Sequence, residues 1–355
     1  MLKNVFDASI KYMQIMDEQG NIDQQLFPSD VDGNKIIEMY TWMSFARALD
    51  AKALSLQRQG RAVTYAPLIG EEATQIGSGM AMGPNDFFVP NFRQHGVFLV
   101  RGLPLDAFFI YWKGYEEGST VGKGINAVPY IVPVATQLPH ATGIAFAQKY
   151  RKTGGTVVTY VGDGGTSEGN FYEAMNFAGV MEVPLVMIIE NNGWAISEPR
   201  SGQTIAPTLA QKAIAAGIPS IQVDGNDVIA VYKATKDAIA RSTDGPTVIE
   251  CLTYRMSMHT TADDPSKYRS DADVEAWKPK DPILRVGNYL KKKGLWDDSK
   301  ESAMVDEHLK RIDAAVERAE AFKADPRSMF QNLYSFIPDT LKEELDAAIA
   351  ANFWQ

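Results

Sequence analysis

The chain has 355 residues and a formal net charge of −9 at pH 7. This length allows one large α/β domain or two smaller ones. The acidic balance, without any block of Lys or Arg, argues against nucleic acid as a partner. No apolar run reaches the ~18 residues that a membrane-spanning helix needs, and the N-terminus resembles neither a signal peptide nor an Arg-rich transit segment. We therefore expect a soluble protein of the cytoplasm that does not insert into a membrane.

The first part of the chain divides into an arm and a helix. Residues 1–34 mix short apolar clusters with polar residues and predict an arm of weak structure. From Lys35 to Leu56 apolar residues recur at intervals of three and four, and Gly60 is suited to cap the C-terminus of that helix.

Glu71 and Glu72 stand where the next helix begins. We predict that both are solvated there; the alternative is that one of them faces a partner.

Residues 89–96, VPNFRQHG, contain two side chains suited to chemistry. Arg93 presents a planar guanidinium that can bind an anion, whereas an arginine in a loop often makes only a surface ion pair. His95 can take part in acid–base chemistry near neutral pH or can simply pack at the start of a helix. The residues leave both interpretations of His95 open. The Gly-rich residues 114–131 are expected to form a loop.

Residues 156–197 predict a strand, a loop, a helix and a second strand. The runs 156–161 and 185–189 have the composition of buried strands. Between them lie a glycine-dense turn, at 162–165, and a segment with helical spacing. Polar residues thus follow both strands at their carboxyl ends, which is the edge where open α/β sheets bind ligands.

The residues at this edge suggest a diphosphate bridged by a metal ion. Glycines let backbone N–H groups approach phosphate oxygens, and the N-terminus of the following helix adds partial positive charge. Mg²⁺ prefers about six oxygen ligands. Asp163 can supply a carboxylate oxygen, Asn192 an amide oxygen and Trp194 a backbone carbonyl, with Gly193 easing the bend between the last two. We therefore predict these three residues as metal ligands.

Strand and helix continue to alternate up to about residue 255. Expected strands at 218–223 and 247–253 enclose a helix that Asn226 or Asp227 would cap, and the alternation predicts a parallel sheet with helices on both faces. The single cysteine, Cys251, falls in the last strand and is expected to be buried, without a disulfide partner. His259 follows that strand, where a histidine can stabilise a developing alkoxide or move protons.

The C-terminal part, from Asp281, is expected to be helical and charged. An apolar cluster near its end has the composition of a docking surface, either on the body of the protein or on a second subunit. The cluster consists of Met329, Phe330, Leu333, Tyr334 and Phe336.

Two sequence segments, GDGGTSEGNFYEAMNFAG and NNGWAIS, resemble those of a known family. Gly162-Asp163-Gly164 followed by Asn191-Asn192 resembles the thiamine diphosphate-binding motif. The flanking residues are similar to the α subunit of the thiamine-dependent first component of 2-oxoacid dehydrogenase complexes, the pyruvate and branched-chain 2-oxoacid dehydrogenase family. The resemblance implies the thiamine diphosphate-binding fold, an α/β fold. It divides the chain into an N-terminal arm (1–34), a diphosphate-type α/β domain (35–285) and a C-terminal helical segment (286–355).

The resemblance also implies roles for residues outside the metal site. Arg93 matches an arginine that contacts the diphosphate, and Phe92 replaces a tyrosine whose hydroxyl is therefore missing. Val132 and Val134 lie in a segment whose backbone reaches the aminopyrimidine ring, and His259 matches an active-site histidine. The implied cofactor-binding set is Phe92, Arg93, Val132, Val134, Gly162, Asp163, Gly164, Gly165, Asn192, Trp194 and His259, with His259 and His95 as candidate catalytic residues.

Three further positions differ among the relatives. The loop 114–131 is short and lacks an Arg and a His that many relatives carry there. Thr136 and Gln137 belong to a monovalent-cation site in some relatives, so such an ion is a further candidate. Thr260 and Ser270 occupy positions that are phosphorylated in some relatives, and nothing in the sequence requires this here.

The resemblance further implies that the chain is one part of a larger enzyme. Only the diphosphate-type half of the cofactor site is visible, so the glutamate that activates thiamine diphosphate should come from a β subunit in an α₂β₂ heterotetramer. The expected reaction is the oxidative decarboxylation of a 2-oxo acid, pyruvate or a branched-chain acid. The acyl group would then pass to a lipoyl domain of the acyltransferase core. Thiamine diphosphate and Mg²⁺ are the expected cofactors.

Two other classes of protein stay open at this point. A NAD-dependent dehydrogenase could use the glycine turn, although Ser167 stands where the dinucleotide fingerprint has its third glycine. Asp163 would also repel a pyrophosphate that carries no metal. A non-catalytic scaffold subunit would keep the fold and bind no cofactor, and Asp163 would then be only a turn former.

Overall fold

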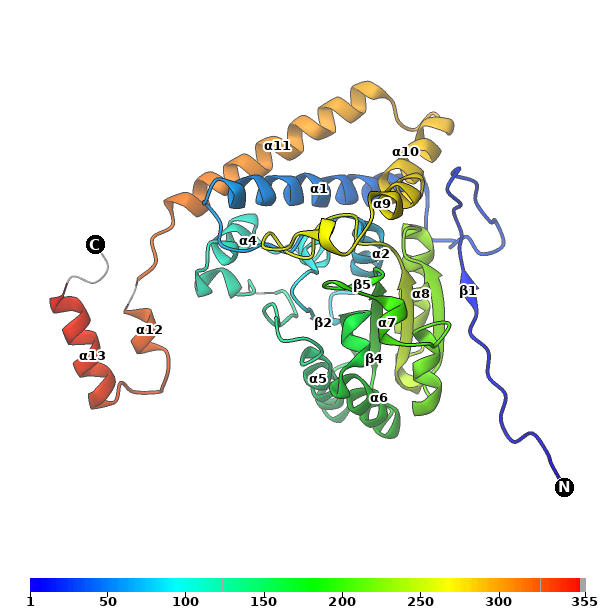
Figure 1. Cartoon of the computed structure of the whole chain (residues 1–355), viewed down its shortest axis with the longest axis horizontal. Helices are drawn as coiled ribbons and strands as arrows, with labels where there is room; N and C mark the ends of the chain where they lie inside the picture. The colour runs from blue at the N-terminus through cyan, green and yellow to red at the C-terminus, as the bar shows by residue number, and fades with distance from the viewer. Residues whose placement is uncertain (123, 326, 352–355) are drawn as a thin grey trace.

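A six-stranded sheet lies at the centre of the molecule (Figure 1). The computed structural model describes residues 1–122, 124–325 and 327–351, so residue 123 of the 114–131 loop and residues 326 and 352–355 of the C-terminal segment lie outside it. The strands lie in the order β1 (Tyr12–Met13), β7 (Ser220–Asp224), β8 (Thr247–Leu252), β4 (Leu185–Asn191), β3 (Val157–Gly162) and β2 (Phe87–Val89), and every neighbouring pair is parallel. The predicted parallel sheet is therefore confirmed.

Helices cover both faces of this sheet. Successive strand residues point to opposite faces, so that Tyr160 and Ile188 belong to one core cluster while Val161 and Ile189 belong to another. The first cluster includes residues of α1 (Gly33–Arg58), α3 (His95–Val100), α4 (Leu105–Trp112), α8 (Val228–Ala240) and α11 (Asp298–Ala321). The second includes residues of α5 (Gln137–Arg151) and α6 (Gly169–Met181). The predicted helices on both faces are thus confirmed.

The two central strands explain where the polar residues of the site end up. Every residue of β4 is buried, because both faces of a parallel sheet are covered. Glu190 and Asn191 therefore lie inside the protein, at the carboxyl end of the strand. Cys251 is likewise fully buried in β8, as predicted.

The N-terminal arm is more ordered than we predicted. Residues 1–9 are exposed, but Tyr12 and Met13 pair with β7, and Ile15 and Met16 are buried. The carboxylate of Asp227 accepts hydrogen bonds from both of their backbone N–H groups, each at 2.6 Å. The same carboxylate caps α8, as the sequence indicated. The prediction of weak structure was wrong for this part of the arm because its partner lies more than two hundred residues further along the chain.

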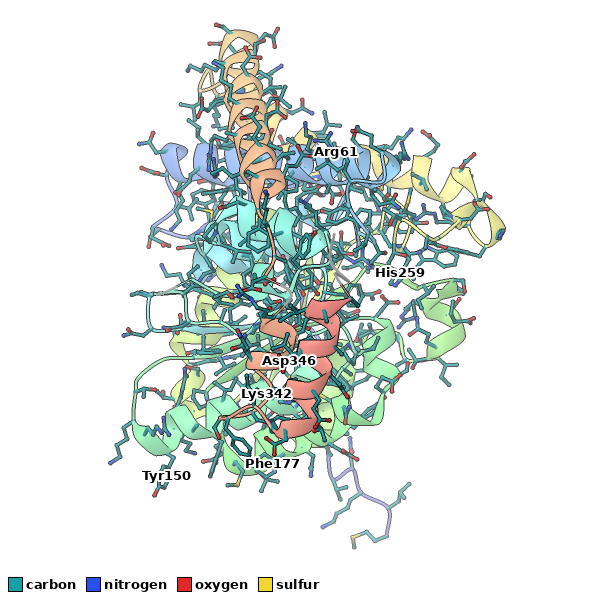
Figure 2. The ribbon with its side chains drawn as sticks, turned by 90° about the vertical axis from the view of Figure 1, so that its left-hand side faces the viewer. Arg61, Tyr150, Phe177, His259, Lys342 and Asp346 are labelled. Atoms are coloured by element: carbon teal, nitrogen blue, oxygen red, sulfur yellow. The ribbon has the colours of Figure 1, made fainter. Side chains whose placement is uncertain are left out.

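The C-terminal segment leaves the body of the protein. Helix α11 runs beside α1, whereas α12 (Ser328–Gln331) and α13 (Asp339–Ala350) stand apart from the rest (Figure 1). Figure 2 shows α13, with Lys342 and Asp346 labelled, in front of the body. Four members of the apolar cluster are exposed: Met329, Leu333, Tyr334 and Phe336. In the described chain these four side chains are therefore not docked on the body.

Shorter elements complete the fold. Helix α2 (Glu72–Ala81) packs against α8, and α9 (Asp271–Trp277) and α10 (Pro282–Lys292) precede α11. A small hairpin of β5 (Trp194–Ala195) and β6 (Glu198–Pro199) leads into α7 (Arg200–Gln203). Short 3₁₀ turns lie at Glu116–Ser119, Gly164–Ser167, Ala210–Ala216, Ser242–Asp244, Pro265–Lys267 and Lys278–Lys280. Within the described ranges no helix is both long enough and apolar enough to cross a membrane.

Candidate functional site

A cavity of about 450 Å³ opens where β3 and β4 end. It is lined by all the residues of the predicted cofactor-binding set, namely Phe92, Arg93, Val132, Val134, Gly162, Asp163, Gly164, Gly165, Asn192, Trp194 and His259. His95 is not among the lining residues. In Figure 2, His259 lies between the layer that contains α1 and α11 and the helices α5 and α6. The fold thus brings together residues from five separate stretches of the chain.

The glycine turn after β3 leaves its backbone accessible to a ligand. A β-carbon on Gly164 would lie 2.6 Å from that of Ala195, and one on Gly165 would lie 2.4 Å from a methyl group of Val161. A β-carbon on Gly162, in contrast, would meet no atom within 4 Å. The turn therefore has no room for side chains on one side and open space on the other, which suits the close approach of a phosphate to backbone N–H groups.

Asp163 lies at the start of this turn and is 2% exposed. Its Oδ2 accepts a hydrogen bond of 3.0 Å from Nε2 of Gln203, in α7. Burial raises the pKa of the Asp163 carboxyl to about 6. No local sequence signal identified Gln203, because it follows a hairpin whose course brings it back over the turn.

Asn192 and Trp194 line the same cavity from the end of β4. The amide Nδ2 of Asn192 donates to Oε1 of Glu71 at 2.6 Å, and its Oδ1 accepts from the backbone N–H of Trp194 at 3.2 Å. The carbonyl of Trp194 accepts a hydrogen bond of 3.2 Å from Nη1 of Arg255. Gly193, between the two, has φ +85°, a conformation that favours glycine, and it supplies the bend that we predicted.

The two glutamates at the start of α2 are not solvated, so that prediction was wrong. Glu71 is 1% exposed and Glu72 is fully buried. Glu72 forms an ion pair of 2.7 Å with Nε of Arg47 in α1, and Glu71 contacts Asn192. Two adjacent glutamates at the start of a helix are usually solvated. Here other elements, from distant parts of the sequence, supply buried partners for both.

Two buried oxygens in the cavity wall have no hydrogen-bond partner in the described part of the chain. One is Oε1 of Glu190, whose other oxygen accepts from Gln94, and the second is Oε1 of Gln137. Burial, followed by the nearby Glu71, raises the pKa of the Glu190 carboxyl well above its usual value. Because buried polar atoms are usually paired, a bound group, an ion or water in this cavity would satisfy both oxygens.

The described residues contain no group of three His, Cys, Asp or Glu side chains that could hold a metal ion. An ion between Asp163 and Asn192 would therefore need further oxygens from the backbone, from water or from a phosphate. Mg²⁺ commonly binds in this way, through one or two side chains and the oxygens of a phosphorylated ligand. The donor set fits a metal that arrives with a diphosphate.

His259 has its protonation state fixed by two arginines. Its Nδ1 lies 3.1 Å from Nη2 of Arg93 and 3.4 Å from Nη1 of Arg255. Because guanidinium groups only donate, Nδ1 accepts and Nε2 carries the proton of the neutral ring. Burial, with the charges of Arg93 and Arg255, lowers the pKa of His259 to about 3. The side chain is therefore a hydrogen-bond donor at neutral pH.

Arg93 lines the cavity and holds neighbouring loops in place through hydrogen bonds to their backbone. Its Nη1 donates to the carbonyl of Pro67, and its Nη2 donates to the carbonyl of His259 at 3.0 Å. The side chain is buried. Arg93 therefore joins two loops and brings its positive charge to the cavity.

The structure does not bring His95 to the cavity. Its Nδ1 lies 2.9 Å from the hydroxyl of Tyr130, its Nε2 lies 3.0 Å from the carbonyl of Ala66, and its ring stacks on Tyr65. Burial lowers the pKa of His95 to about 3. With both ring nitrogens engaged, this geometry favours packing at the start of α3, the second of the two interpretations.

A parallel α/β sheet that ends in a glycine turn, a buried carboxylate and a histidine around one cavity defines a cofactor-binding α/β enzyme chain. A sequence model of the family described as "Dehydrogenase E1 component" matches residues 40–327. The "Pyruvate dehydrogenase E1 component subunit alpha" of Staphylococcus aureus strain Mu50 is 41% identical over 348 residues, which cover 97% of this chain and 94% of that protein. The protein of the same name from Staphylococcus epidermidis matches to the same extent.

The chain therefore belongs to the dehydrogenase E1 component family, as an α chain of a 2-oxoacid dehydrogenase. Membership implies thiamine diphosphate as the cofactor. The family that the sequence motifs indicated is thus confirmed.

Proposed function

We propose that this chain binds thiamine diphosphate with Mg²⁺ and, together with a β subunit, decarboxylates a 2-oxo acid and transfers the acyl group to a lipoyl domain. The observation that carries the proposal is the single cavity lined by all eleven residues of the predicted cofactor-binding set. Asp163, Asn192 and the carbonyl of Trp194 would hold the ion, and the backbone of the glycine turn would face the diphosphate. When bound, thiamine diphosphate supplies the electron sink that decarboxylation requires.

The residues of this chain would contribute orientation and hydrogen bonding. The Nε2–H of His259 would donate to the oxygen of the substrate or acyl group where negative charge develops, since the neutral ring has its proton on that nitrogen. Arg93 would hold His259 in place and add positive charge near the diphosphate. We assign His95 to packing, with no direct contact to the reacting atoms.

The mouth of the cavity supports the proposal of a β subunit. Val132, Val134 and Ile196 line the cavity and are 55%, 50% and 55% exposed. Apolar side chains exposed beside a binding site are typical of a surface that a partner covers. We therefore propose an α₂β₂ heterotetramer in which the β subunit closes the site, and an acyltransferase core with lipoyl domains as its partner in the cytoplasm.

The substrate is proposed from the relatives and from a second cavity. Pyruvate is the acid in the name of the staphylococcal proteins. A neighbouring cavity of about 300 Å³ shares Phe92, Val132 and Thr260 with the first and is otherwise lined by residues such as Tyr65 and Trp112. Its apolar walls would accept the side chain of a 2-oxo acid, so branched-chain acids are the alternative to pyruvate.

A monovalent cation is proposed at the start of α5. The hydroxyl of Thr136 donates to the carbonyl of Pro133 at 2.8 Å, and Oε1 of Gln137 is one of the two unpaired buried oxygens in the cavity wall. A cation near these oxygens would satisfy Gln137.

The proposed function is tested by co-expression of this chain with the β chain from the same source. We expect the assembly to bind thiamine diphosphate only with Mg²⁺ and to release carbon dioxide from pyruvate or from branched-chain 2-oxo acids, with acyl transfer to an added lipoyl domain. Binding of NAD without Mg²⁺ would favour a dehydrogenase that uses nicotinamide. Failure of the assembly to bind either cofactor would favour a scaffold subunit.

A further inference from the structure

Glu71 contacts the predicted metal site but belongs to neither the Gly162-Asp163-Gly164 motif nor the Asn191-Asn192 motif. Its Oε1 accepts a hydrogen bond of 2.6 Å from Nδ2 of Asn192, and its side chain is 1% exposed. The residue stands at the N-cap of α2, whereas Asp163 and Asn192 directly follow β3 and β4. The hydrogen bond between Glu71 and Asn192 therefore joins the start of α2 to the carboxyl end of β4.

The hydrogen bond decides which way the amide of Asn192 faces. An amide has a donor end and an acceptor end, and here the donor end of Asn192, Nδ2, faces Oε1 of Glu71. Its Oδ1 then lies on the opposite side, where it accepts from the backbone N–H of Trp194. A cation requires this oxygen and is repelled by the NH₂ group.

Glu71 is itself held in one position. Nε of Arg93 lies 3.9 Å from the same Oε1, and Nε2 of Gln75 lies 3.5 Å from the other carboxylate oxygen. A buried carboxylate that left the arginine would lose a compensating charge, which is costly. The acceptor that orients Asn192 is therefore fixed before any ligand arrives.

We infer that Glu71 is a positioning residue of the metal site, which orients Asn192 so that the amide oxygen faces the cation. This inference rests on the proposed function, because it takes Asn192 as a metal ligand. Glu71 acts through Asn192 and is not a ligand itself. Hydrogen-bond partners of metal ligands typically contribute about 10- to 100-fold in metal affinity.

The test compares variants of Glu71 in the full chain assembled with its β subunit. Glu71→Met keeps much of the volume but has no acceptor, while Glu71→Gln keeps an acceptor oxygen and loses the charge. At saturating thiamine diphosphate, calorimetry gives the Mg²⁺ concentration at which half of the cofactor-binding sites are occupied. We expect this concentration to rise about 10- to 100-fold in Glu71→Met and to stay within about 3-fold of the wild type in Glu71→Gln.

A matched control comes from the adjacent residue. Glu72 is also buried at the start of α2, but it pairs with Arg47 and not with the metal site. Glu72→Gln should lower the thermal unfolding temperature of the cofactor-free assembly without shifting the Mg²⁺ dependence. Glu71→Ala is measured beside Glu71→Met, so that the test does not depend on one variant folding. In an Asn192→Ala background, neither change at position 71 should have any further effect on Mg²⁺.

The outcomes separate this inference from the function on which it rests. If the wild type binds thiamine diphosphate equally well in EDTA, the proposed function itself fails. If the wild type requires Mg²⁺ but Glu71→Met and Glu71→Ala match it, the positioning role of Glu71 is overturned. The role is also overturned if Glu71→Gln is as weak as Glu71→Met, because charge would then matter more than the hydrogen bond, or if Glu72→Gln shifts the Mg²⁺ dependence equally.

Discussion

At His259, two arginine side chains determine which ring nitrogen carries the proton. Nδ1 faces the guanidinium groups of Arg93 and Arg255, so the hydrogen atom belongs on Nε2. A histidine after a strand at the ligand edge was predictable from the sequence. The tautomer was not, because Arg93 comes from a loop that precedes His259 by 166 positions.

Substitution of His259 tests whether its role is to donate a hydrogen bond. We expect His259→Ala to lower kcat of the assembled enzyme by about 100-fold, since loss of one such donor commonly costs about 10²–10³-fold. The side-chain amide of His259→Gln can donate from near the position of Nε2, so this variant should retain clearly more activity. Equal losses in the two variants would contradict the assignment.

The pKa of His259 makes a second prediction. Because its pKa is lowered to about 3, the ring should stay neutral from pH 5 to pH 8. Nitrogen NMR of labelled histidine in the assembled protein should then show one protonated and one unprotonated ring nitrogen throughout this range. A change to the doubly protonated ring near pH 6.5, the ordinary pKa of histidine, would show that the arginines do not control it.

At the scale of elements, Asp227 joins the N-terminal arm to α8. Its carboxylate accepts hydrogen bonds from Ile15 and Met16 in the arm and from Ile229 and Ala230 in the first turn of the helix. Asp227→Ala would remove a helix cap and leave buried N–H groups unpaired. We expect the free energy of unfolding to fall by about 2–4 kcal/mol, as measured by urea denaturation. A loss below about 0.5 kcal/mol, the lower end for a helix cap, would contradict this account of the arm.

Asp227 also predicts a pH dependence of stability. Burial raises its pKa to about 6 in the folded protein, so the folded state binds a proton more tightly than the unfolded state does. The stabilisation is fully present below pH ~4, the unfolded pKa, and is lost as the pH rises to about 6, by about 3 kcal/mol in total. In Asp227→Asn, which does not titrate, the total fall in unfolding free energy between pH 4 and pH 6 should be smaller by about 3 kcal/mol. Identical slopes in the two proteins would contradict the prediction.

The strands were largely predictable because they are buried on both faces. Such strands have continuous apolar runs, and the predicted run 185–189 lies within β4. The residues that hydrogen-bond to the predicted metal ligands were not predictable in the same way. Glu71 meets Asn192 across 121 positions, and Gln203 meets Asp163 across 40. Contacts of this kind depend on how helices and hairpins pack, which local patterns do not specify.

At the scale of the whole molecule, exposed apolar side chains point to assembly. They occur around the mouth of the cavity and in the C-terminal segment that stands apart from the body (Figure 1). Sedimentation of the co-expressed α and β chains should give the mass of an α₂β₂ heterotetramer. Replacement of Val132 and Val134 by Asp should weaken that assembly without unfolding the α chain, because both side chains are about half exposed. If the heterotetramer forms to the same extent, Val132 and Val134 do not belong to the interface between the α and β subunits.

The carboxylate of Asp163 tests the central claim, that the cavity holds a metal-bound diphosphate. Thiamine diphosphate is titrated by calorimetry into the α and β assembly, with Mg²⁺ and with EDTA, for the wild type and for Asp163→Ala. We predict tight binding only for the wild type with Mg²⁺, and a thermal unfolding temperature without cofactor that is at least as high in the variant, because the buried carboxylate is removed. Binding of thiamine diphosphate that survives both EDTA and the loss of Asp163 would contradict the account.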